Sequence, residues 1–265
     1  MKNILVPIGT SSNATNTLQY AIDFAEAFNS DIYVMQAFSA MTKAGTIANV
    51  EEVVERTSIE QLQDIVAKVD KKNVTVKILT YKGEVVSGLK AIDSELGIDL
   101  IILEPKSNDI REELFLGHTS GSIIKHTDIP ALIVPEGNTF TPPESILTAF
   151  KSGILKDEKI LKPLLEIKDK FSAINNLLLV KTPLTEEEDL EVNPALTQIS
   201  EELITSINTS TFEGVLEHFQ TYNPDMLCVF RRKRGFFTKL WEKNTILKSE
   251  FRCSIPVLVL SVKKY

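Results

Sequence analysis

The chain has 265 residues, of which 43% are hydrophobic, and a formal net charge of −7. This length and apolar content suit two domains of about 130 residues, and no apolar run approaches the roughly 18 residues of a membrane-spanning helix. The acidic excess lies in residues 1–140, where 19 acidic side chains oppose 12 basic ones, and this balance argues against a general nucleic-acid-binding protein. The sequence begins with an apolar strand rather than a leader segment, so we expect a cytoplasmic location.

Apolar strands and helices alternate along the first half. Strands are predicted at residues 3–8, 32–38, 74–79, 99–103 and 130–134. Helical spacing of apolar residues predicts helices over 18–28, 47–70 and 85–96, and a further helix that contains Ile123 and Ile124. Because the central strands lack a clean polar face, this order predicts a five-stranded parallel sheet with helices on both sides.

The closing strand of this pattern occurs twice. Ile129-Pro130-Ala131-Leu132-Ile133 is followed 126 residues later by Ile255-Pro256-Val257-Leu258-Val259, and the same offset relates residues 97–103 to 223–229. The sequence therefore predicts two tandem doubly wound five-stranded α/β domains of the Rossmann-like class. We place them at residues 1–137 and 145–265, with a Pro-containing polar linker at 138–144.

The second half restarts less clearly. Strands at 146–150 and 177–180 flank a helix over 160–171, and about 17 residues are missing between its second strand and its third helix. The acidic run at 186–189 lies in this shortened part, where we expect a solvated loop or a helix start.

A ligand crevice in such a sheet opens at the carboxyl ends of the first and fourth strands, where the strand order reverses. There, His118 is either a phosphate donor or a surface residue at a helix start, and Ser11, Thr119 and Ser120 are either ligand donors or helix caps. The candidate cleft of the first half consists of Pro7, Ile8, Gly9, Thr10, Ser11, Met35, Gln36, Ala37, Glu104, Ser107, Gly117, His118, Thr119 and Ser120.

No pattern of catalytic residues is present. The sequence lacks HExxH, GxSxG and GxxxxGK[ST], so we predict no catalytic residues and no enzyme activity. Without a CxxC or a nearby His pair, we predict neither a metal site nor a disulfide. Cys228 and Cys253 are interpreted as small buried apolar residues.

A basic run followed by aromatic residues is the candidate interaction surface, formed by Arg231, Arg232, Arg234, Phe236, Phe237 and Trp241. The simplest interpretation is a solvated basic loop followed by an amphipathic helix. Two others remain, a surface for a partner protein and an anion or nucleic-acid patch.

The sequence resembles the universal stress protein family in its tandem two-domain form. The resemblance rests on Ile4-Leu5-Val6-Pro7, on Ser11 with the helix after it, on Phe115-Leu116-Gly117 and on residues 129–134. It implies a fold like that of the adenine nucleotide alpha hydrolases. It also implies that the two halves pair through their last strands, and we expect a homodimer.

Nucleotide-binding members of that family carry a glycine, two residues, a second glycine, nine residues, and a third glycine followed by Ser or Thr. Here Glu104 and Ser107 stand at the first two glycine positions, and His118 follows Gly117 in place of the hydroxyl residue. Gly9 replaces the acidic residue that faces the nucleoside. A carboxylate at position 104 would repel a triphosphate. In the second half Phe230, Lys233, Lys243 and Asn244 occupy the motif positions, and Lys151 replaces the acidic residue.

The resemblance therefore implies a non-enzymatic stress-response protein that acts through contacts with an unidentified protein partner, with its ATP-binding motif largely lost in both halves. On this interpretation it holds no cofactor and binds neither nucleic acid nor membrane. The alternative is an adenine-nucleotide-binding protein that holds ATP or AMP in the first-half cleft, with at most slow ATPase activity.

Overall fold

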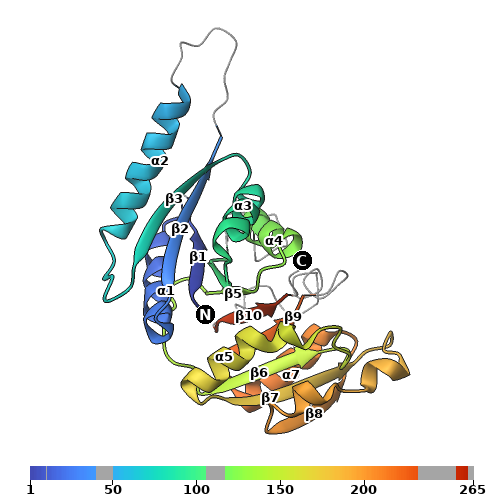
Figure 1. Cartoon of the computed structure of the whole chain (residues 1–265). Coiled ribbons are helices and arrows are strands. Elements are labelled where there is room, and N and C mark those ends of the chain that lie inside the picture. The colour runs from blue at the N-terminus through green and yellow to red at the C-terminus, as the bar shows by residue number, and fades with distance from the viewer. Residues whose placement is uncertain (10, 40–49, 106–116, 232–254, 262–265) are drawn as a thin grey trace.

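The computed structural model describes all residues except 10, 40–49, 106–116, 232–254 and 262–265 (Figure 1). The first half comprises β1 (Asn3–Pro7), α1 (Ala14–Phe28), β2 (Asp31–Phe38), α2 (Val50–Val66), β3 (Val76–Lys82), α3 (Val85–Leu96), β4 (Leu100–Leu103), α4 (Gly117–His126) and β5 (Ala131–Ile133). The second half comprises β6 (Ser145–Phe150), η1 (Glu158–Leu161), α5 (Lys162–Phe171), β7 (Ile174–Lys181), η2 (Glu187–Leu190), α6 (Pro194–Thr197), β8 (Glu202–Ile207), α7 (Thr211–Tyr222), β9 (Met226–Phe230) and β10 (Val257–Leu260).

The ten strands form one sheet in the order β3-β2-β1-β4-β5-β10-β9-β6-β7-β8. Within each half all neighbouring strands are parallel, and the order is the same in both halves. The halves meet where β5 and β10 pair antiparallel, with Leu132 opposite Leu258. The predicted α/β fold class is confirmed, and the last strands of the two halves pair with each other.

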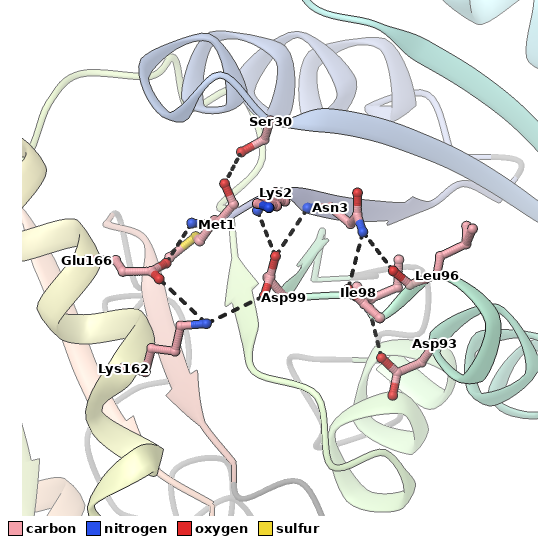
Figure 2. A network of polar contacts seen from close by, with 11 residues as sticks. Met1, Lys2, Asn3, Ser30, Asp93, Leu96, Ile98, Asp99, Lys162 and Glu166 are labelled. Atoms are coloured by element: carbon pink, nitrogen blue, oxygen red, sulfur yellow. Dashed lines mark hydrogen bonds and ion pairs between the residues drawn. The ribbon is translucent and has the colours of Figure 1, made fainter.

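The same aspartate contact holds the start of the first strand in both halves. The Asp99 carboxylate accepts hydrogen bonds from the backbone N–H groups of Lys2 and Asn3 (2.6 and 3.2 Å), and Figure 2 shows this contact. The Asp225 carboxylate accepts equivalent bonds from Glu144 and Ser145, both at 2.9 Å. Each aspartate thereby ties the entry of the fourth strand to the start of the first strand beside it.

Helices cover both faces of the sheet, and each face has one apolar core that runs through both halves. Buried residues of α1, α2 and α5 belong to one core, and those of α3, α4 and α7 belong to the other. On the first face Phe140 joins the halves, because its ring lies 5.8 Å from both Phe24 of α1 and Phe171 of α5. No described helix is long and apolar enough to cross a membrane.

The connection between the second and third strands differs most between the halves. In the first half it contains α2, whose 17 residues pack along β2 and β3 (Figure 1). In the second half it contains only η2 and the four-residue α6. The acidic residues 186–189 form the start of η2 and are exposed or half-buried, in line with the predicted helix start.

Candidate functional site

The carboxyl ends of β1 and β4 lie side by side, since Ile4 and Leu5 pair with Leu100 and Ile101. Beyond β1 the backbone N–H of Ile8 donates to the Met35 carbonyl at 2.8 Å, which joins this turn to β2. At Gly9 the chain borders open space, because a Cβ added there would have no heavy atom within 4 Å. The first half therefore leaves room beside its first strand.

Glu104 follows β4 directly and projects a carboxylate toward α1. Its Oε2 accepts a hydrogen bond from the Thr17 hydroxyl at 3.3 Å, and Thr17 lies in the first turn of α1 with 2% of its surface exposed. The Ser120 hydroxyl donates to the Glu104 carbonyl at 2.7 Å. Since the N-terminal end of a helix carries positive potential, the carboxylate occupies a place that would favour an anion from solution.

The other predicted hydroxyl donors near this point already have structural partners. The Ser11 hydroxyl accepts a hydrogen bond from the Asn13 backbone N–H at 3.1 Å, just before α1 begins. Ser120 is buried in α4 and uses its hydroxyl on the main chain of residue 104. Thr119 is half-buried in the first turn of α4. The hydroxyls of Ser11 and Ser120 therefore each bond to the main chain, although neither of these bonds caps a helix, and the choice between ligand donor and helix cap stays a prediction.

The remaining predicted residues are only partly brought together. Met35 is fully buried, and the Gln36 side chain donates to Gln61 of α2 at 3.1 Å. Residues 35–37 also pair along β3, so much of their backbone is already used. Gly117 and His118 belong to the first turn of α4. Thr10 and Ser107 lie outside the described residues.

In the second half, residues 186–193, which we call the strap, reach the carboxyl end of β6. The Gly153 N–H donates to the Asp189 carbonyl at 2.8 Å, and the Asn193 N–H donates to the Gly153 carbonyl at 3.0 Å. A Cβ added at Gly153 would lie 2.5 Å from the Glu191 carbonyl oxygen. The chain thus packs against itself in the region where the first half is open at Gly9.

Arg231 lies between the two halves. Its guanidinium donates to the carbonyls of Ile124 (3.1 Å), Lys125 (3.3 Å) and Thr127, at the C-terminal end of α4, and pairs with Asp128. This part of the predicted interaction surface is engaged within the chain. Its other residues, Arg232, Arg234, Phe236, Phe237 and Trp241, lie outside the described residues.

A separate cavity of about 220 Å³ lies beside the linker, at the amino ends of β9 and β10. Tyr20 forms part of its wall, and burial raises the pKa of this phenol above its usual value. Because the cavity lies at the amino ends of strands, it is distinct from the predicted cleft, which opens at the carboxyl ends. It is lined by Tyr20, Asn138, Thr139, Thr141, Pro143, Asp225, Met226, Ile255 and Pro256.

Comparison with known proteins decides the family. Residues 1–135 match the model of the universal stress protein family. The chain belongs to this family. No curated protein matches it.

Solved structures show the same fold at low identity. A universal stress protein from Archaeoglobus fulgidus superposes with a TM-score of 0.70 at 16% identity, over 98% of this chain and 96% of that one. A putative universal stress protein from Pseudomonas aeruginosa UCBPP-PA14 gives a TM-score of 0.56 at 15% identity, over 98% and 92% of the two chains. Both likenesses extend across the two halves and concern the fold alone.

Sequence reasoning missed Thr17 and Gly153. The sequence offers one signal for Thr17, because it lies four residues before Ala21 on the buried side of the predicted first helix. A buried polar residue at such a position needs a hydrogen-bond partner. Gly153 has none, because its contact depends on the path of the strap nearly 40 residues later.

Proposed function

We propose that this universal stress protein acts without catalysis, through contacts with other proteins, and that neither half binds ATP in the manner of the nucleotide-binding family members. The observation that carries the proposal is the Glu104 carboxylate, which directly follows β4 and accepts a hydrogen bond from the Thr17 hydroxyl in the first turn of α1. A triphosphate placed there would meet a negative charge in a partly desolvated site.

The second half supports the same conclusion in another way. Its strap is hydrogen-bonded on both sides of Gly153, beside the end of β6. Phe230, at the first position of the nucleotide motif, is buried and packs edge-on against Phe150 with ring centroids 6.2 Å apart. Opening a phosphate site here would require moving backbone and aromatic side chains together.

A second candidate function is adenine-nucleotide binding in the first half. The open space at Gly9 favours it, because a ligand could approach the backbone there without a clash. On this alternative, ATP or AMP would bind despite Glu104, with the carboxylate displaced from Thr17.

Native mass spectrometry with Mg-ATP and AMP separates the two. The proposal expects no stoichiometric adduct on the wild-type chain at millimolar ligand. One nucleotide per chain would establish the alternative. Any hydrolysis of ATP above background, dependent on Mg²⁺, would contradict the absence of catalysis.

A gain-of-binding variant tests the physical reason. The changes Gly9→Asp, Glu104→Gly, Ser107→Gly and His118→Ser together restore the family pattern, and a Cβ added at Gly9 meets no heavy atom within 4 Å. We expect Mg-ATP affinity to rise by at least about tenfold, measured by calorimetry. A charge control is Glu136→Gly, which removes one carboxylate from an exposed site after β5, whereas the fourfold variant exchanges one carboxylate for another and leaves the formal charge unchanged. If the control gains as much affinity as the variant, general charge rather than the motif blocks ATP.

A further inference from the structure

The strand at the outer edge of the second half carries exposed apolar side chains. β8 is the last strand of the sheet and pairs only with β7 among the described residues. Of its side chains, Leu203 is 42% exposed and Ile207 is 83% exposed, and Thr205 between them is also exposed. Alternation along a strand places these three on one face, the face that carries α1, α2 and α5.

The opposite edge of the same sheet shows how such a strand is normally protected. On β3, Thr80 donates to Glu55 of α2 at 3.1 Å, and Lys82 forms an ion pair with Glu51 of α2. Strand register makes Thr80 and Lys82 the counterparts of Thr205 and Ile207. The second half has no described helix in the place of α2, and an exposed isoleucine stands where the first half has a paired lysine.

Exposed edge strands are usually protected by lysine, proline or a bulge. Between residues 202 and 207, β8 carries one charged residue, Glu202, and no lysine or proline. A strand with these properties favours pairing with another strand.

We propose that β8 pairs antiparallel with β8 of a second copy of this chain, about a two-fold axis at Thr205, so that one sheet continues through both molecules. The sequence of the strand selects this partner, because it is self-complementary in this register. Leu203 then lies opposite the partner's Ile207, Ile207 lies opposite the partner's Leu203, and Thr205 meets its own copy. Both apolar pairs lie on the uncovered face.

Neighbouring registers are less favourable. An axis one residue earlier places Ile207 opposite the partner's Glu201 and Leu203 opposite the partner's Thr205. An axis at Thr205 places Glu202 opposite the partner's Asn208, so that no like charges face each other directly across the junction. This dimer is independent of nucleotide binding and leaves β5 and β10 paired within each chain.

Sedimentation velocity over a concentration series tests the proposal. The wild-type chain is expected to show a monomer–dimer equilibrium. Thr205→Lys, which places two ammonium groups at the axis, and Ile207→Lys are each expected to raise the dissociation constant at least about tenfold. Val53→Lys is the matched control, because Val53 is 50% exposed on α2 of the first half, and it should leave the equilibrium unchanged. Thermal unfolding checks that each variant folds.

A double variant tests the register. Leu203→Glu alone should weaken the dimer, but Leu203→Glu with Ile207→Lys should recover much of the affinity, because each new glutamate then faces a lysine of the partner. Thr205→Cys in a Cys253→Ser background should form a disulfide-linked dimer on oxidation, since directly opposed antiparallel residues lie within disulfide reach. A wild-type chain that stays monomeric, a dimer insensitive to Thr205→Lys, or a double variant no tighter than its singles would each overturn the proposal.

Discussion

Arg231 offers the most direct test of how the two halves are held together. The residue directly follows β9 in the second half, and its guanidinium donates to three carbonyls at the end of α4 in the first half and pairs with Asp128. The last carbonyls of a helix have no partner within the helix and carry negative potential. Replacing Arg231 with Ala therefore removes a charged cap and leaves Asp128 without its cation.

The expected cost follows from these contacts. Hydrogen bonds to a charged group contribute roughly 1.5–3 kcal/mol, and a cation at a helix C-terminus up to about 2 kcal/mol. Both side chains remain partly exposed, 19% for Arg231 and 32% for Asp128, so water compensates part of the loss. We expect Arg231→Ala to lower the free energy of unfolding by about 2–3 kcal/mol, which is roughly 4–12 °C in Tm for a chain of this size. Urea unfolding followed by circular dichroism measures it.

Two further variants separate the cap from a simple ion pair. Arg231→Lys keeps the positive charge but not the planar fork, so it should recover only part of the loss. Lys162→Ala also removes a contact between the halves (Figure 2), but the Lys162 side chain is 64% exposed and its ammonium lies 3.9 Å from the Asp99 carboxylate. It should cost at most about 0.5 kcal/mol. An Arg231→Ala variant as stable as Lys162→Ala would refute the reasoning and leave Arg231 available to a partner protein.

Three more predictions concern the second half. Gly153→Ala should cost about 1–3 kcal/mol in urea unfolding and speed proteolysis of the strap, because its Cβ would collide with backbone, whereas Gly9→Ala should be neutral; equal effects would contradict the packing of the strap. Thr148→Val should cost about 1–3 kcal/mol by leaving the buried Asn175 Oδ1 without its donor, and adding Asn175→Ile should cost less than the sum of the two single changes; additive costs would argue against their coupling. Burial raises the pKa of the Cys228 thiol from 9.0 to about 12, so the folded state resists its ionisation. The stability that depends on the neutral thiol is complete below pH 9 and is lost as the pH rises toward 12. Between pH 8 and 10 the free energy of unfolding of the wild type should therefore fall by about 1 kcal/mol more than that of Cys228→Val. Equal losses would mean that the thiol ionises freely.

Most of the fold could be predicted because it depends on local patterns. Apolar runs bounded by Asp99 and Asp225 are recognisable in the sequence, and in both halves the same aspartate holds the same pair of backbone N–H groups. β8 was not located individually, because three of its six residues are polar, and of its apolar side chains Leu203 and Ile207 are exposed and Ile204 is half-buried. A search of the sequence for buried apolar positions does not detect a strand whose outer side chains are exposed.

The candidate site could be predicted only in part, for a related reason. The candidate cleft residues were predicted from their positions after strands, but the Thr17 partner of Glu104 comes from a distant segment. Thr17 lies 87 residues from Glu104, and Arg231 lies more than 100 residues from the end of α4. Sequence spacing carries no signal for such contacts.

The two halves also differ in the polarity of buried side chains on their three central strands. Strand register makes Val6, Ile32 and Ile102 the counterparts of Thr148, Asn175 and Cys228. All six are fully buried, but only the second set is polar or weakly polar.

Within that second set, Thr148 donates to Asn175 at 2.6 Å, and the Asn175 amide donates to the Ile199 carbonyl at 3.2 Å. That carbonyl lies just before β8, in the connection that replaces α2. Because a buried amide requires partners, these two hydrogen bonds hold the short connection against the core. The polar core of the second half therefore bonds directly to the short connection that leads to β8.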